Sequence, residues 1–187
     1  MNDTKTQKSQ PSLDTLAPVQ LVALLAKHHF DGEAPPVSWA ASNELAARGK
    51  AAIGALLAGL AHPDAKVRAA CALLLDHVAD NRCIEPLLQA MQHDPHEAVR
   101  RCAMHALVCD GCKECPLDTD VVGALIESAR TDRSRAVRRR TVFYLSQQRP
   151  DARMGPALEA LLADETDAII RQRARRALAG LGPAGGE

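Results

Sequence analysis

Small and apolar residues recur along the chain with the spacing of one face of a helix. In four segments they stand four, seven and eight positions after a valine or isoleucine. The four sets are Cys71, Leu74 and Leu75; Ala103, Ala106 and Leu107; Thr141, Tyr144 and Leu145; and Ala174, Ala177 and Leu178. Spacing of i, i+3 and i+4 predicts one buried stripe on each helix, and the small members let neighbouring helices approach closely.

The four segments are copies of one repeat. Their marker residues are Val67, Val99, Val137 and Ile170, at intervals of 32, 38 and 33 residues, and each is followed by arginine. A degenerate earlier copy begins at Val37, with Ser38 in place of the arginine. A second helical run follows Val37, Val67, Val99 and Val137, at 51–60, 83–92, 119–130 and 153–163 respectively. The repeating unit is therefore a helix pair, which buries its apolar face only by stacking on the next pair.

The phrase D-P-x-x-x-V-R-x-x-A-x-x-A-L, from Asp94 to Leu107, resembles the short bacterial HEAT repeats that also occur in phycobilisome lyases. The resemblance extends over about residues 37–181. It implies an all-α, right-handed α-solenoid of about five HEAT-like helix pairs. Repeats of this kind serve as scaffolds, adaptors, inhibitors and occasional enzymes, so the fold alone does not assign an activity.

The two ends of the chain have a different character from the repeats. We expect a disordered tail at 1–12, an N-terminal capping helix with its linker at 13–36, the solenoid at 37–181 and a frayed C-terminus at 182–187. The capping helix is predicted from a dense apolar run at 19–26, and the linker from the glycine and prolines at 31–36.

Composition narrows the class of protein further. The 187 residues carry 23 Lys and Arg against 23 Asp and Glu, and only four aromatic side chains. Nucleic acid is therefore an unlikely partner on sequence grounds, because net positive charge and stacking residues are both lacking. Nucleophile-elbow, Walker and dinucleotide-binding motifs do not occur, which lowers the odds of an enzyme. A polar beginning and no apolar stretch of membrane-spanning length predict a cytoplasmic protein without a membrane partner.

The long 38-residue interval contains a cysteine cluster. About six extra residues separate the two helices of that copy, and they carry Cys109, Cys112 and Cys115 at C-x2-C-x2-C spacing. Cys102 and His105 lie on the preceding helix and could supply a fourth ligand, so the cluster predicts a possible zinc site or iron–sulfur cluster. Two other interpretations stay open, namely free loop thiols and a reversible Cys109/Cys112 redox pair.

Arginines concentrate in the last two copies. Eight arginines and two aspartates lie between positions 130 and 153, and stacking would place Arg138 beside Arg171 and Arg140 beside Arg173. Such a ladder could bind an acidic protein surface or, less readily, a phosphate backbone. Alternatively, the shared arginine pairs within the fold with junction acids. The acids in question are Asp64, Asp94, Asp132 and Asp164.

Together these features predict a non-enzymatic scaffold or adaptor that binds a partner protein, possibly an acidic one. Two alternatives remain: a lyase- or chaperone-like accessory factor for a cofactor or another enzyme, and a metal- or redox-sensing regulator that uses the cysteine cluster.

Overall fold

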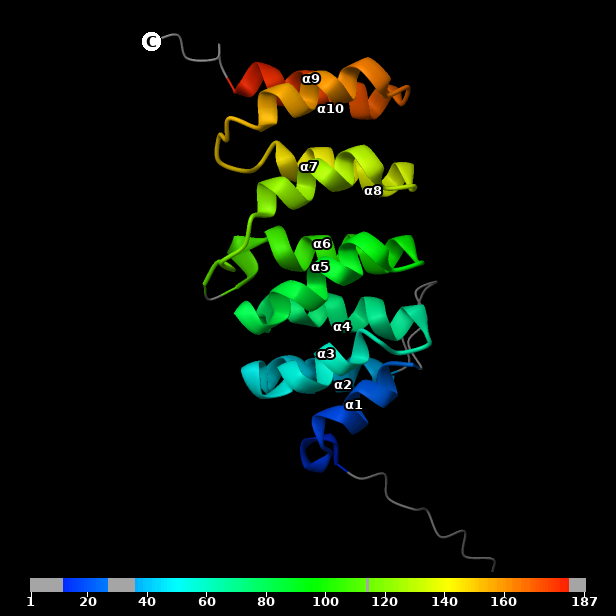
Figure 1. The fold of residues 1–187 in the computed structure, drawn as a ribbon. Coiled ribbons are helices and arrows are strands. Elements are labelled where there is room, and N and C mark those ends of the chain that lie inside the picture. The colour runs from blue at the N-terminus through cyan, green and yellow to red at the C-terminus, as the bar shows by residue number, and fades with distance from the viewer. Residues whose placement is uncertain (1–11, 27–35, 114, 182–187) are drawn as a thin grey trace, which may run out of the picture.

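The computed structural model describes residues 12–26, 36–113 and 115–181, and within them every regular element is helical. Figure 1 shows the helices stacked in layers along one axis. The α-helices of these residues are α1 (Pro18–Leu25), α2 (Pro36–Ala47), α3 (Ile53–Gly59), α4 (Ala65–Val78), α5 (Ile84–His93), α6 (Glu97–Val108), α7 (Val121–Thr131), α8 (Arg135–Leu145), α9 (Met154–Asp164) and α10 (Ala168–Gly180). The all-α solenoid expected from the repeats is confirmed.

Each repeat marker lies in the first turn of a helix, and these helices form one row along the stack. Helices α2, α4, α6, α8 and α10, which we call the A helices, each contact the next A helix along the chain. The intervening helices α3, α5, α7 and α9 pack against the A helix that follows them. Within the described residues the stack thus holds four helix pairs and α10, the first helix of a fifth copy.

The apolar stripe that defines each repeat forms the core of the stack. Val67, Val99, Val137 and Ile170 are fully buried, as are the residues four positions later, Cys71, Ala103, Thr141 and Ala174. Thr141 is the polar member of this set. Its hydroxyl donates to the carbonyl of Val137 at 3.0 Å and lies 3.1 Å from the Ser128 hydroxyl of α7, so the buried oxygen is satisfied.

An N-terminal segment covers the first pair. Helix α1 packs on α2, α3 and α4 and buries Leu21, Val22 and Leu25. Arg48, after α2, donates to the carbonyls of Leu13 and Leu16 at 3.1 and 2.5 Å, which fixes the segment at its start. The tail at 1–12 (except Ser12), the linker at 27–35 and the end at 182–187 lie outside the described residues. None of the described helices is both long enough and apolar enough to span a membrane.

Buried ion pairs join consecutive repeats. The arginine after each of the markers Val67, Val99 and Val137 reaches the loop before the next A helix and forms a two-pronged pair with an acid there. Arg68 binds Asp94 at 2.7 and 3.0 Å, and Arg100 binds Asp132 at 2.7 and 2.9 Å. Each of these guanidinium groups also donates to backbone carbonyls of its own repeat, at His62 and Asp94 respectively. One side chain therefore links three chain segments.

The last junction changes the acid but keeps the arrangement. Arg138 binds Glu165, at 2.9 and 3.4 Å, rather than the expected Asp164. Arg139 adds a second pair with Asp167, at 3.0 and 2.6 Å. Asp167 also caps α10 by accepting from the backbone of Ile169 and Ile170. The start of the final helix is thus held by the helix before it.

This junction makes stability depend on acidity. Hydrogen bonds from Arg139, opposed by burial, hold the pKa of Asp167 at about 2, below its ordinary 3.8. The unfolded chain therefore takes up a proton first, and we expect the free energy of unfolding to fall as the pH drops from about 4 to about 2. Urea unfolding at a series of pH values measures this. Asp167→Asn should give a shallower decline, and an unchanged decline would contradict the assignment.

Candidate metal centre and partner-binding face

Part of the cysteine cluster converges on the end of an adjacent helix. Asp76 of α4, His105 of α6, and Cys109 and Cys112 after α6 each offer one ligand atom, and these four atoms lie within 4.8 Å of one another. Cys109 caps the C-terminus of α6, and the short helix η4 (Asp110–Cys112) turns the chain back. That turn places two thiols three residues apart beside the same carboxylate.

Polar contacts within the cluster leave one oxygen without a partner. The Cys109 and Cys112 sulfurs are 2.9 Å apart, and His105 Nε2 lies 3.1 Å from Asp76 Oδ2. Asp76 Oδ1 is buried, and no hydrogen-bond partner for it is found among the described residues. The Lys113 ammonium, itself bonded to the Cys109 carbonyl, lies 3.8 Å from that oxygen. A buried carboxylate oxygen in this condition is costly unless a cation is close by.

The neighbours of Cys112 favour its thiol form. The adjacent Cys109 sulfur, and after it the Asp76 carboxylate, raise the pKa of Cys112 to about 12. Hydrogen bonds to these two neighbours favour the thiol in the metal-free protein, so a bound metal ion would have to displace this proton.

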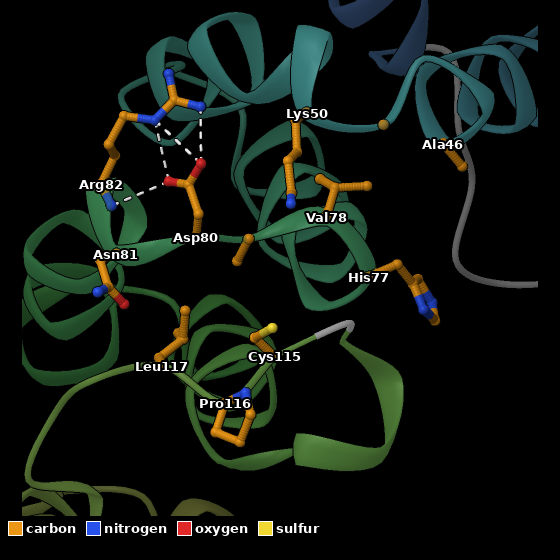
Figure 2. A pocket seen from close by; sticks show the side chains of 12 residues that line it. Ala46, Lys50, His77, Val78, Asp80, Asn81, Arg82, Cys115, Pro116 and Leu117 are labelled. Atoms are coloured by element: carbon orange, nitrogen blue, oxygen red, sulfur yellow. Dashed lines mark hydrogen bonds and ion pairs between the residues drawn. The ribbon is translucent and has the colours of Figure 1, made fainter.

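The other two proposed ligands lie elsewhere. Cys102 is on α6, in a hollow over the A helices, and is not a member of the convergent group. Cys115 is exposed and lines a separate hollow of about 570 Å³ between the end of α2, the loop after α4 and its own loop. Figure 2 shows Cys115 beside Pro116 and Leu117 on one wall of that hollow, with the Arg82–Asp80 ion pair at its rim. The structure thus gathers three of the five residues and adds Asp76.

The four arginines of the expected ladder divide into two kinds. Arg138 is engaged with Glu165, and Arg171 donates to the carbonyls of Leu162 and Glu165 at 2.7 and 2.9 Å. Both therefore have partners inside the fold. Their assignment to partner binding stays a prediction. In the structure both side chains hold neighbouring segments of the fold together.

Arg140 and Arg173 lie on the A helices beside aromatic rings, and neither pairs with a carboxylate of the described residues, although Arg173 also donates to the backbone carbonyl of Arg139 at 2.5 Å. The Arg140 guanidinium is 5.0 Å from the ring centre of Tyr144 and 5.6 Å from that of Phe143, while Arg173 is 5.8 Å from Phe143. These distances are within the range of cation–π attraction. With Arg101 and Arg176 they form a surface that we call the arginine–aromatic face: Arg101, Arg140, Phe143, Arg173 and Arg176.

Two shallow hollows shape the arginine–aromatic face. One, of about 500 Å³, runs across four A helices from Leu73 of α4 to Arg173 of α10; the other, of about 510 Å³, extends from Phe143 to the end of α10. Within the described part of the chain, no carboxylate lies within ion-pair distance of the four guanidinium groups of this face. Among the described residues, no acidic side chain therefore neutralises these four charges directly.

Comparison with known proteins agrees with the layered geometry. A family model described as HEAT repeats matches residues 53–109. Residues 53–109 are therefore similar to HEAT repeats, and the stacked helix pairs continue on both sides of them. A chain in the complex of CpcE and CpcF of phycocyanin lyase from Nostoc sp. PCC7120 has the same HEAT fold, with a TM-score of 0.66 and 21% identity over 86% of this chain and 97% of that one. No curated protein matches the sequence. The resemblance to HEAT repeats of the phycobilisome-lyase type is thus confirmed at the level of the fold.

Sequence reasoning missed Asp76 because it lies in the preceding HEAT repeat, 29 positions before His105. A local signal was present. Nine positions after the markers, the other full copies carry Val108, Ser146 and Ala179, whereas this copy has an acid at the end of the apolar run Leu73-Leu74-Leu75. A charged residue at a position that is uncharged in the other copies indicates a side chain with a specific partner.

Proposed function

We propose that this HEAT chain is a non-enzymatic adaptor that binds an acidic surface of a partner protein through the arginine–aromatic face. The observation that carries the proposal is the set of four guanidinium groups without a carboxylate partner in the described structure, two of which, Arg140 and Arg173, lie beside the exposed Phe143. Arginine and aromatic residues are the types enriched where protein interfaces concentrate their binding energy.

The surroundings of the face favour a protein over a nucleic acid. Phe143 is 39% exposed and lies next to two arginines, which suits a partner that offers carboxylates around an apolar side chain. A sequence with zero net charge and four aromatics lacks the excess of positive charge and the stacking residues that single-stranded nucleic acid requires.

Charge reversal tests the face. We expect Arg140→Glu combined with Arg173→Glu to weaken binding to a glutamate-rich peptide by about tenfold or more, because two attractions become repulsions at the centre of the face. Fluorescence anisotropy at low and moderate salt measures the affinity, and salt should weaken the wild-type complex.

The matched control carries the same change of charge elsewhere. Arg130 on α7 and Arg149 after α8 are exposed and lie outside the arginine–aromatic face. Arg130→Glu with Arg149→Glu should retain most of the affinity, provided that circular dichroism shows both double variants folded. Equal losses in the two variants would mean that overall charge, and not this face, attracts the peptide. Stronger retention on duplex DNA than on the peptide would favour a nucleic-acid partner instead.

A second candidate is a lyase- or chaperone-like accessory factor. Its support is that the similar solved structure is a two-chain complex of phycocyanin lyase, whose chain is covered over 97% of its length. Under this proposal the partner is a second HEAT chain, and the pair assists attachment of a cofactor to another protein. Bilin attachment to phycocyanin, measured with and without this chain and a HEAT partner, tests it; no gain in attached bilin would contradict it.

A further inference from the structure

We propose that Asp76, His105, Cys109 and Cys112 form a tetrahedral Zn²⁺ site that joins α4 to the loop inserted after α6. His105 borders the hollow of the arginine–aromatic face, but none of the four donors is a residue of that face, and the site does not rest on the proposed function. The donors would be one carboxylate oxygen, one imidazole nitrogen and two sulfurs, which is a complete set of four for a structural zinc ion.

The spacing of the donors fits a single small ion. Bonds of about 2.0–2.3 Å to zinc place tetrahedral ligand atoms roughly 3.3–3.8 Å apart. The four candidate atoms already lie within 4.8 Å of one another, with His105 and Asp76 separated by 3.1 Å and the two sulfurs by 2.9 Å. Shifts of about 1 Å, largely in a surface loop, would bring all four to bonding positions.

Asp76 supplies a second and independent argument. Its side chain is 2% exposed, and its Oδ1 atom is the buried side-chain polar atom found without a hydrogen bond in the described residues. A carboxylate at the end of a leucine-rich helix is expensive without a cation. Zinc coordination would satisfy this oxygen, whereas the Lys113 ammonium, at 3.8 Å, lies beyond hydrogen-bond distance.

Charge balance gives Lys113 a role beside the ion. Zn²⁺ with one carboxylate, two thiolates and a neutral imidazole carries one net negative charge. The Lys113 side chain, 1% exposed and bonded to the Cys109 carbonyl, would neutralise it. A half-buried site with no net charge avoids most of the desolvation penalty that an isolated ion would incur.

The second nitrogen of His105 is already oriented. Tyr144 of α8 places its hydroxyl 2.8 Å from Nδ1, while Nε2 faces Asp76. Histidine ligands of zinc usually have the nitrogen that does not bind the metal fixed by such a partner. A phenol hydroxyl can donate to or accept from Nδ1, so it supports the ring both with and without the ion.

The donor types favour zinc over an iron–sulfur cluster. Such clusters are held mainly by cysteine thiolates, and Cys102 and Cys115 are not in the convergent group. A mixed carboxylate, imidazole and thiolate set matches the preferences of Zn²⁺.

Direct binding of Zn²⁺ and Co²⁺ to the reduced, untagged protein tests the site. We expect about one equivalent of Zn²⁺ by elemental analysis after dialysis. Co²⁺ should give strong visible absorption typical of tetrahedral coordination and a near-ultraviolet sulfur-to-cobalt band. Cys109→Ser and Cys112→Ser should lose that band and weaken Zn²⁺ binding by about 100-fold or more, while Tyr144→Phe should weaken it about 10- to 100-fold.

Two cysteines outside the group provide matched controls. Cys102→Ser and Cys115→Ser should bind Zn²⁺ as the wild type does, because neither sulfur belongs to the cluster. The proposal is overturned if the reduced protein binds no Zn²⁺, or if the control variants lose as much affinity as Cys109→Ser. Purification with iron and a visible cluster absorption would overturn it too, as would a Cys109–Cys112 disulfide whose reduced form binds no metal. Circular dichroism of each variant separates loss of the site from loss of the fold.

Discussion

Replacing Arg100 with alanine is expected to lower the free energy of unfolding by about 3–5 kcal/mol. The side chains of Arg100 and Asp132 are only 3% and 5% exposed, and the two form a two-pronged ion pair between the copies whose markers are Val99 and Val137. Alanine would leave the Asp132 carboxylate buried without its counter-charge, and would also remove the donor to the Asp94 carbonyl. Urea unfolding followed by circular dichroism at neutral pH measures the difference.

A surface pair of the same residue types provides the control. Arg82 is 64% exposed and binds Asp80 in the loop after α4. Because water screens this pair, Arg82→Ala should change the free energy of unfolding far less than Arg100→Ala does. A loss of similar size in both variants would contradict the view that buried junctions hold the stack together. Arg100→Met with Asp132→Leu should recover much of the loss, since no charge is then left buried and unpaired.

The stack itself could be predicted because its information is local and repeated. Each copy carries the same apolar spacing after its marker, and a helix pair with one apolar flank has nowhere to bury it except on the next pair. The pairing of the shared arginine with Asp94 and Asp132 was foreseen among the alternatives for the same reason. Glu165 was not, although it stands five positions before its marker, as Asp94 and Asp132 do before theirs; the expectation of Asp164 followed the residue type and not the spacing.

The candidate site could be predicted only in part. Cys109 and Cys112 converge because they stand three positions apart in one turn, and His105 precedes Cys109 by one helical turn. Both relations are local and can be read from the sequence spacing. Asp76 belongs to a neighbouring layer, and only the packing of α4 on α6 brings it there. Cys115 fits the same local motif, yet the chain carries it past the cluster to the hollow beside η3 (Asn81–Cys83).

Gly59→Ala should destabilise the N-terminal junction by about 1–3 kcal/mol, the usual cost of an extra methyl group in a packed core. Gly59 ends α3 where α1 and α4 meet: a β-carbon there would lie 2.4 Å from the Cys71 sulfur and 3.1 Å from a methyl carbon of Val22. Both neighbours are buried, so relief requires α1 or α4 to move.

A second glycine of the same helix separates this steric effect from helix propensity. Gly54 in α3 has open space around its α-carbon, so Gly54→Ala should leave stability unchanged or raise it by up to about 1 kcal/mol. If the free energy of unfolding, measured by thermal and urea unfolding, falls for Gly59→Ala and does not fall for Gly54→Ala, then α1, α3 and α4 meet at a contact that only glycine fits. Cys71→Ala should restore part of the loss when combined with Gly59→Ala, because it removes the nearest atom. Equal stabilisation by both single substitutions would mean that the close approach is absent and that α1 does not dock on the first pair.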